Sequence, residues 1–150
     1  MTLKTTKTTV TDFLSQRVLA VVGASRDPKK FGNSIYRELK RKGYKVLPVN
    51  PQAETIDGDP CYPNLSALPE TPGGIVVVVP PAETEKIVRE VSAAKITRVW
   101  LQRGAESQEA LRYCEANGIQ VITGECILMF AEPAAFYHRI HRFFRGKLKD

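Results

Sequence analysis

The sequence predicts a single α/β domain: a Rossmann-like, doubly wound sheet of five parallel strands inside a three-layer αβα architecture. Short apolar runs alternate with amphipathic segments of helical length, which is typical of right-handed βαβ units. One run, residues 74–79 (GIVVVV), is apolar on both faces, as expected of a central strand in a parallel sheet. The length of 150 residues and the hydrophobic share of 43% fit one globular core, so we expect residues 1–150 to form one domain.

The first half of the chain supplies two predicted strands and a helix. After an N-terminal extension with helical character at 1–17, residues 17–23 (RVLAVVG) form an apolar run that ends at glycine. A helix is predicted over 33–42, where Ile35 and Leu39 lie four apart and Gly43 provides a C-cap. Residues 44–49 (YKVLPV) form the second strand, and residues 50–73, rich in Pro, Asp, Gly and Asn, are predicted to be a long loop.

The second half continues the alternation. Ile87 and Val91 share a helical stripe, while Ser107 and Gly118 are suited to begin and end a helix. The predicted elements are a third strand at 74–79, a helix at 82–95, a fourth strand at 97–102, a helix at 107–118, a fifth strand at 119–123 and a final helix at 133–145, inside a basic C-terminal segment at 133–150.

Composition excludes several protein classes. No apolar run approaches the roughly 20 residues that span a bilayer, and the N-terminus lacks the apolar core of a secretory signal. Cys61, Cys114 and Cys126 have neither metal-ligand nor disulfide-framework spacing. We therefore expect a cytoplasmic protein in a reducing compartment, with no membrane segment.

The formal charge of +6 is concentrated in the C-terminal segment. Nucleic-acid binding through residues 137–150 is one hypothesis, but no base-reading motif accompanies the charge, so nucleic acid is not the expected partner. His138 and His141 lack the further ligands that a metal needs, and no metal site is predicted. An apolar stripe is expected to pack on the core, with a contact to a second copy of the chain as the alternative; its members are Phe136, Ile140, Phe143 and Phe144.

Candidate site residues follow the predicted strands, because doubly wound sheets bind ligands beyond the carboxyl ends of their strands. After the first strand, residues 23–33 (GASRDPKKFGN) lead directly into a helix, which is a favourable place for a phosphate. The segment is neither a G-x-G-x-x-G fingerprint nor a P-loop, and it carries Arg26, Lys29 and Lys30. The alternative interpretation is a glycine-rich turn with solvated charges.

The other strand ends are also informative. The second ends at Asn50 and Pro51, where an NAD-binding domain usually has an acidic residue for the ribose. Asn50 is suited either to contact a ribose or adenine or to form an Asx turn. Val79 and Pro80 are candidates for an apolar wall, with an ordinary helix-starting proline as the alternative. The fourth strand ends in Gln102, Arg103 and Gly104, where Gln102 offers an amide and Gly104 gives access; the alternative is a plain strand-to-helix turn.

Several segments in this order resemble one family: 21–33 (VVGASRDPKKFGN), 43–51 (GYKVLPVNP), 62–65 with 68–69, 79–80, 100–104 (WLQRG) and 124–129 (GECILM). From residue 18 to about 130, the chain resembles the CoA-binding domain family. These are small stand-alone proteins similar to the CoA-binding domain of the succinyl-CoA synthetase α subunit and of ADP-forming acyl-CoA synthetases.

The resemblance implies coenzyme A at the strand ends, with the diphosphate on the Gly23–Asn33 loop and the adenosine near Asn50. A cationic loop without an acidic ribose clamp also suits its three phosphates better than it suits NAD. The predicted cofactor-binding residues are Gly23, Ala24, Ser25, Arg26, Lys30, Phe31, Gly32, Asn33, Asn50, Pro51, Val79, Pro80, Gln102, Arg103 and Gly104.

Departures from the synthetases shape the functional expectation. Their phosphohistidine domain and nucleotide lobe have no counterpart in this chain, so we predict no catalytic residues and a non-catalytic CoA- or acyl-CoA-binding module. The synthetase lysine after the second strand aligns with Ala53, which leaves Lys29 or Lys30 for the 3′-phosphate. Cys126 is a candidate thiol for a mixed disulfide with coenzyme A, or else a buried small residue. The alternative function is an NAD(H)-binding redox sensor or a small dehydrogenase.

Overall fold

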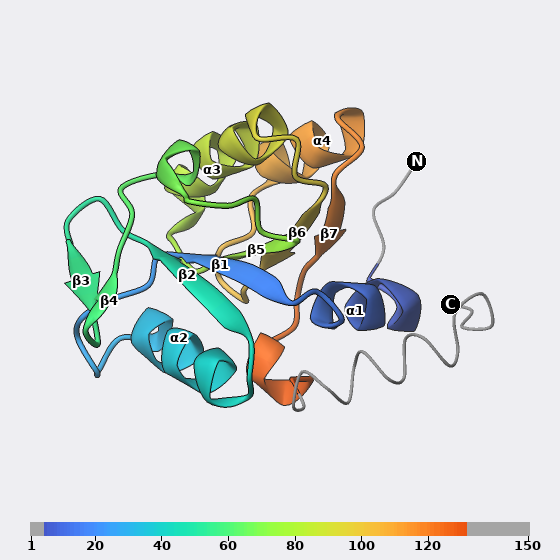
Figure 1. The fold of residues 1–150 in the computed structure, drawn as a ribbon. Coiled ribbons are helices and arrows are strands. Elements are labelled where there is room, and N and C mark those ends of the chain that lie inside the picture. Colours follow the sequence, from blue (N-terminus) through green and yellow to red (C-terminus); the bar gives the residue numbers. More distant parts are fainter. Residues whose placement is uncertain (1–4, 132–150) are drawn as a thin grey trace.

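The computed structural model describes residues 5–131, and these residues form a parallel sheet between two helical layers (Figure 1). The strand order is β2-β1-β5-β6-β7, and every neighbouring pair is parallel. The predicted fold class is thus confirmed. The strands are β1 (Val18–Val22), β2 (Lys45–Val49), β5 (Gly74–Val77), β6 (Arg98–Leu101) and β7 (Gln120–Ile122).

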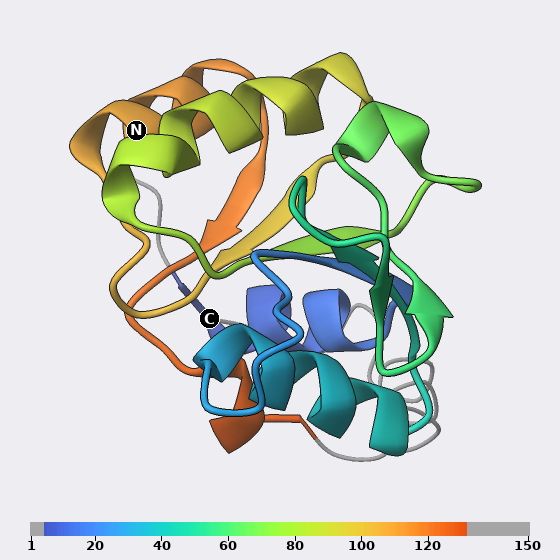
Figure 2. The same cartoon turned by 90° about the vertical axis from the view of Figure 1, so that its left-hand side faces the viewer.

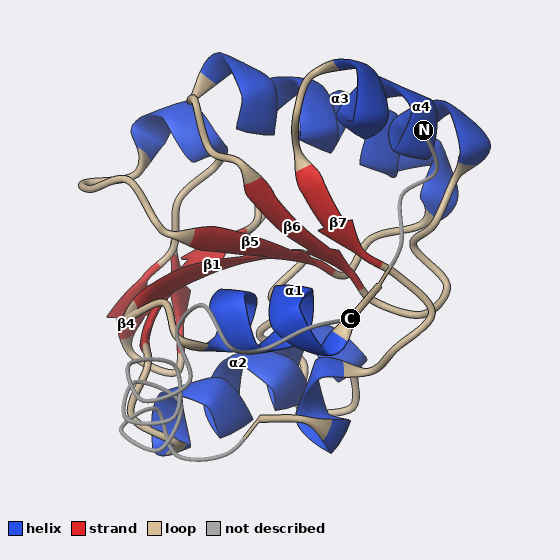
Figure 3. Ribbon diagram, turned by 90° about the vertical axis from the view of Figure 1, so that its right-hand side faces the viewer, coloured by secondary structure: helices blue, strands red, loops and turns tan. Residues whose placement is uncertain are grey.

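Helices cover both faces of this sheet, as the two turned views show (Figures 2 and 3). One face carries α1 (Lys7–Leu14), α2 (Phe31–Arg41) and the 3-10 turn η2 (Ile127–Met129). The other carries α3 (Pro81–Ala93), α4 (Gln108–Ala116) and the 3-10 turn η1 (Leu65–Ala67). No helix of the described part of the chain is long and apolar enough to cross a membrane.

Alternation along the strands creates two separate cores. In β1, Leu19 and Val21 face the layer of α1 and α2, whereas Ala20 and Val22 face the layer of α3 and α4. Successive side chains of a strand point to opposite faces, so a strand that is apolar throughout is buried on both sides. This is why these strands read as continuous apolar runs in the sequence.

Helix α1 is fixed to the sheet by an aromatic contact and an ion pair. The rings of Phe13 and Trp100 meet edge to face with centroids 5.4 Å apart. The Arg98 Nε atom donates to the Asp12 carboxylate at 2.6 Å, and both side chains are partly buried. The N-terminal extension therefore contains a helix that belongs to the sheet packing.

The structure differs from the predicted loop at 50–73. This segment contains η1 and a two-stranded antiparallel hairpin of β3 (Thr55–Ile56) and β4 (Asp59–Pro60). The turn is Asp57–Gly58, both with positive φ, which suits the strand twist of a tight hairpin. The third strand is also shorter than predicted: it ends at Val77, although the Val78 N–H still donates to the Val22 carbonyl of β1 at 2.8 Å.

The other predicted strands and helices are present, with ends that differ by one or two residues. Ser107 caps α4 as expected, because its Oγ atom accepts a hydrogen bond from the Ala110 amide at 3.0 Å. The predicted final helix at 133–145, with its histidines and aromatic stripe, lies outside the described residues.

Candidate functional site

A cavity of about 710 Å³ opens at the carboxyl ends of β1 and β5. These strands are neighbours at the centre of the sheet, and the chain leaves them in opposite directions, to β2 and to β6. Such a switch point is the usual ligand site of a doubly wound sheet, and the volume is in the range of small-molecule sites. Figure 2 looks onto this edge, with the blue β1–α2 loop crossing it.

Two glycines let the β1–α2 loop, α2 and the end of β5 approach within backbone contact. Gly23 has φ +98°, and a Cβ atom there would lie 2.1 Å from the Val78 carbonyl oxygen. A Cβ atom on Gly32 would lie 2.0 Å from the Gly23 carbonyl oxygen. No larger side chain fits either place without moving the backbone, so these glycines form a floor that a ligand can approach closely.

Two asparagine side chains hold the loop in shape. The Asn33 amide donates to the Ser25 carbonyl at 2.8 Å, and the Asn50 amide donates to the Ala24 carbonyl at 2.8 Å. The Gly23 N–H donates to the Val49 carbonyl at 3.0 Å. Because Asn33 is only 2% exposed, its part is to support the loop from below.

The first turn of α2 is open toward the cavity. Its N-cap residue, Lys30, provides no side-chain hydrogen bond. Within residues 5–131, the Phe31 and Gly32 amides donate to no acceptor, and both residues line the cavity. Unpaired amides together with the positive end of the helix dipole favour an anion at this position.

Most of the predicted cofactor-binding residues lie together in this cavity. Its lining includes Gly23, Ser25, Lys30, Phe31, Gly32, Asn50, Pro51, Val79 and Pro80. Ala24 is fully buried beneath the loop, and Arg26 lines a smaller hollow beside the cavity. The cations of the loop therefore face different spaces, with Lys30 in the cavity and Arg26 next to it.

The predicted residues after β6 do not line the cavity. Gln102 is 2% exposed, and its Oε1 atom accepts from the Ile127 amide at 2.7 Å. A buried amide requires a partner, so Gln102 is used to fix η2 to the sheet. Arg103 donates to the Gly124 carbonyl at 3.2 Å, and the Gly104 amide donates to Glu106 at 2.8 Å.

Asn50 forms an Asx turn, which was one of the two interpretations of this residue; the other was a contact to a ribose or adenine. Its Oδ1 atom accepts from the Gln52 amide at 2.8 Å, and its backbone N–H donates to the Tyr62 carbonyl at 2.9 Å. The Cys61 thiol contacts the Asn50 carbonyl at 3.7 Å, and burial raises the pKa of this thiol. Asn50 thus shapes the cavity wall at the end of β2.

Cys126 lies outside the cavity lining. Its Sγ atom accepts from the Gln102 side chain at 3.5 Å, and the residue is partly buried. The mixed disulfide with a ligand thiol stays a prediction.

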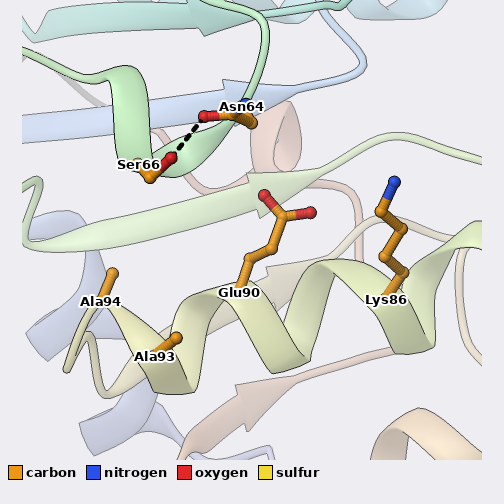
Figure 4. Close-up of a pocket in the computed structure, with 6 residues that line it drawn as sticks. All are labelled: Asn64, Ser66, Lys86, Glu90, Ala93 and Ala94. Carbon is orange, nitrogen blue, oxygen red and sulfur yellow. Dashed lines mark hydrogen bonds between the residues drawn. The ribbon is translucent and has the colours of Figure 1, made fainter.

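Sequence reasoning missed the wall opposite the loop, which comes from η1 and α3: Asn64, Leu65, Glu83, Lys86, Ile87 and Glu90. Glu90 and Lys86 rise from one face of α3 toward Asn64 and Ser66 (Figure 4), where a second hollow of about 370 Å³ adjoins the cavity. The Glu90 carboxylate accepts from the Leu65 amide at 3.4 Å. Ile87 was assigned to the core stripe, and only the path of residues 50–73 shows that it borders a cavity.

Fold and site together define a class of protein. A switch-point cavity with a glycine floor and an open helix N-terminus characterises α/β domains that bind phosphate-bearing nucleotide ligands.

Comparison with known sequences gives the family. Residues 17–132 match the family described as CoA binding domain, and the chain belongs to this family. It is 31% identical over 123 residues to an ADP-forming acetate–CoA ligase I of Archaeoglobus fulgidus, covering 75% of this chain and 18% of that protein. It is 30% identical to uncharacterized protein YneT of Bacillus subtilis, covering 73% of this chain and 81% of YneT.

Solved structures agree with this assignment. A conserved hypothetical protein from Pyrococcus furiosus superposes with a TM-score of 0.73 at 42% identity, covering 75% of this chain and 97% of that one. A dinucleotide-forming acetyl-coenzyme A synthetase 1 of Ca. Korarchaeum cryptofilum superposes with a TM-score of 0.62 at 30% identity, covering 70% of this chain and 25% of the synthetase. The chain therefore spans only a small part of the ligases and synthetases that it resembles.

Proposed function

We propose that this protein binds coenzyme A or an acyl-CoA and does not itself transform it. The observation that carries this proposal is the open first turn of α2, whose Phe31 and Gly32 amides face a cavity of about 710 Å³. The diphosphate of coenzyme A lies against these amides and Gly23, with the Lys30 ammonium beside it. Anions are favoured at such helix starts.

The adenosine half lies along the wall that runs from Asn50 toward η1 and α3. Pro51, Leu65 and Ile87 give this wall an apolar surface for the base, as small-molecule sites usually provide. The strand end at Asn50 carries no carboxylate to accept from a ribose hydroxyl, which favours coenzyme A over NAD(H).

Two polar side chains of the lining are used to shape the cavity. The Ser25 Oγ atom accepts from the Asp27 amide at 3.0 Å, and the Glu90 carboxylate accepts from the Leu65 amide at 3.4 Å, which suits a binding site. The three cysteines are free thiols, which supports a reducing, cytoplasmic setting. On this proposal, the protein is a carrier or sensor of its ligand.

Isothermal titration calorimetry with coenzyme A tests the proposal. Wild-type protein is expected to bind coenzyme A more tightly than NADH. Lys30→Glu is expected to weaken the binding of coenzyme A at least tenfold, because it places a carboxylate beside the diphosphate, and tenfold corresponds to about 1.4 kcal/mol.

The matched control is Lys29→Glu, the same charge reversal one residue earlier, at a side chain that does not line the cavity. It is expected to stay close to wild type, because distant exposed charges are screened by salt. No binding of coenzyme A by the wild type, or tighter binding of NADH, contradicts the proposed function.

A further inference from the structure

We propose that Arg26 binds the 3′-phosphate of coenzyme A and thereby selects it over dephospho-CoA. This inference rests on the proposed function. The sequence left Lys29 or Lys30 as the cation for the 3′-phosphate, and the present proposal gives that role to Arg26.

The first observation is a hollow of about 350 Å³ beside the main cavity. Ser25 and Asn50 line both spaces, so the hollow adjoins the cavity at the end of β2. The ribose of a nucleotide lies near this strand end in doubly wound sheets, and an arginine close by accommodates an additional ribose phosphate. The complete lining is Ser25, Arg26, Asp27, Asn50, Gln52 and Ala53.

The second observation is the state of Arg26 itself. Its side chain is exposed, it lines this hollow, and it forms no ion pair with any group of residues 5–131. Lys29 and Lys30 do not line the hollow. A guanidinium group matches a phosphate with two parallel hydrogen bonds, so the one cation of the hollow also has the geometry that the ligand requires.

The neighbours of Arg26 leave room for the phosphate. Ala53 contributes only a methyl group to the lining. Asp27 is the one acidic residue there, and its Oδ1 atom accepts from the Lys29 amide at 2.9 Å. The Gln52 backbone N–H already donates to the Asn50 Oδ1 atom, and the Gln52 side chain carries no charge. Arg26 is therefore the group in this hollow with unused donors and a positive charge.

A separate role follows for Lys30. It lies at the start of α2 in the main cavity, beside the amides that hold the diphosphate. The diphosphate is present in both coenzyme A and dephospho-CoA. Removing the Lys30 charge should therefore weaken both ligands, whereas removing the Arg26 charge should weaken only the ligand that carries the 3′-phosphate.

The experiment is calorimetric titration of coenzyme A and dephospho-CoA into wild type, Arg26→Ala, Lys30→Ala and the double variant Arg26→Ala with Ala53→Lys. Arg26→Ala is expected to raise the Kd of coenzyme A about tenfold and to leave that of dephospho-CoA unchanged. Lys30→Ala raises both Kd values by the same factor. The double variant, with a cation returned to the same hollow, recovers most of the preference.

Two results overturn the assignment while leaving the proposed function intact. Equal weakening of both ligands by Arg26→Ala would place Arg26 at the diphosphate, and unchanged binding of both would place the 3′-phosphate elsewhere. A wild type that binds neither ligand overturns the proposed function and the assignment with it. Thermal melts of each variant establish that it is folded. Arg26 and Lys30 are exposed, so their substitution to alanine is expected to change stability little, whereas Ala53 is partly buried against the core, and the double variant is compared only if its melt shows that it is folded.

Discussion

At the scale of single residues, Gly32 shows how tightly the site is built. Alanine stabilises most helix positions relative to glycine by about 1 kcal/mol. Here the added methyl group would lie 2.0 Å from the Gly23 carbonyl oxygen, so α2 would have to move away from the loop. The close contact, rather than helix propensity, decides the residue at this position.

We expect Gly32→Ala to lower the free energy of unfolding by about 2 kcal/mol, the typical cost of an overpacked contact, and to weaken the binding of coenzyme A. Ser34→Ala, an exposed position in the same helix, is the control and should stay within about 0.5 kcal/mol of wild type. Denaturant unfolding measures both variants. A Gly32→Ala variant as stable as the wild type would show that the loop can relax without cost.

Residue patterns singled out the loop side of the cavity and gave no indication of the α3 side. Glycines, small residues and cations directly after a strand are enough to indicate a phosphate site, because they mark a helix start that an anion can approach. Lys86 and Glu90 have no such marker, because their position in the cavity depends on where η1 packs against α3. Gln102 lies at the expected strand end, yet the buried Ile127 amide determines where its side chain points.

At the scale of elements, the β3–β4 hairpin is anchored to α2 by three side chains that meet at Asp59, in addition to an exposed Arg37–Asp57 ion pair at 3.6 Å. The Tyr36 hydroxyl and the Lys40 ammonium both donate to the Asp59 carboxylate. The Lys40 ammonium, followed by the Tyr36 hydroxyl, lowers the pKa of Asp59. Burial, with the nearby Asp59 charge, raises the pKa of Tyr36. The anchor at Asp59 thus contains two groups whose pKa values are shifted.

The anchor predicts a pH window for stability. Tyr36→Phe should lower the free energy of unfolding by about 1 kcal/mol near pH 7, the usual net value of a hydrogen bond. The folded-state pKa of Tyr36 is raised. The stability that Tyr36 contributes is therefore fully present below the unfolded pKa of about 10 and is lost as pH rises further. The folded-state pKa of Asp59 is lowered, so the stability that Asp59 contributes is lost only as pH falls below about 4.

The difference between wild type and Tyr36→Phe, measured by urea unfolding across pH, should therefore form a plateau that declines on both sides. Tyr113→Phe is the control, since the Tyr113 hydroxyl makes no hydrogen bond within the described residues, and it should change stability little at pH 7. A difference between wild type and Tyr36→Phe that does not vary with pH would argue against the anchor.

The hairpin also marks a limit of element prediction from sequence. The Asp57–Gly58 pair is a recognised turn signal, but strands of two residues are too short to show alternation. The longer strands were predictable because each is largely apolar and is bounded by turn residues. The hairpin is held largely by tertiary contacts to α2, which local sequence does not encode.

At the scale of the whole molecule, the two cores lie on opposite faces of the sheet, and the cavity lies at one end of it. Phe13 belongs to the core under α1 and α2. Its ring lies against Gly74, the first residue of β5, where an added Cβ atom would be 2.6 Å from the ring. The cavity is at the other end of β5, and Phe13 does not line it, so this side chain supports the fold without contributing to the cavity.

Phe13→Ala should lower the free energy of unfolding by about 3 kcal/mol, as large-to-small substitutions of buried aromatic residues do. The Kd for coenzyme A should be unchanged at temperatures where the variant is fully folded. Denaturant unfolding and calorimetry on the same samples check both parts. A changed Kd in the folded variant would mean that the two ends of the sheet are coupled.

The arrangement of the sheet was more predictable from the sequence than the short elements or the cavity lining. Right-handed crossovers between apolar strands leave few topologies, and a strand that is apolar on both faces must be central. What the sequence left open is the depth and outline of the cavity, because these depend on how residues 50–73 fold across the sheet edge.

The uncapped beginning of α2 has a consequence for the stability of the native state. A helix whose leading amides lack acceptors is incomplete by itself, and an arriving oxyanion completes it. Any molecule that binds only the native state also shifts the folding equilibrium toward that state. An anion bound at the first turn of α2 is therefore expected to stabilise the native state, because it supplies the acceptor that these amides lack.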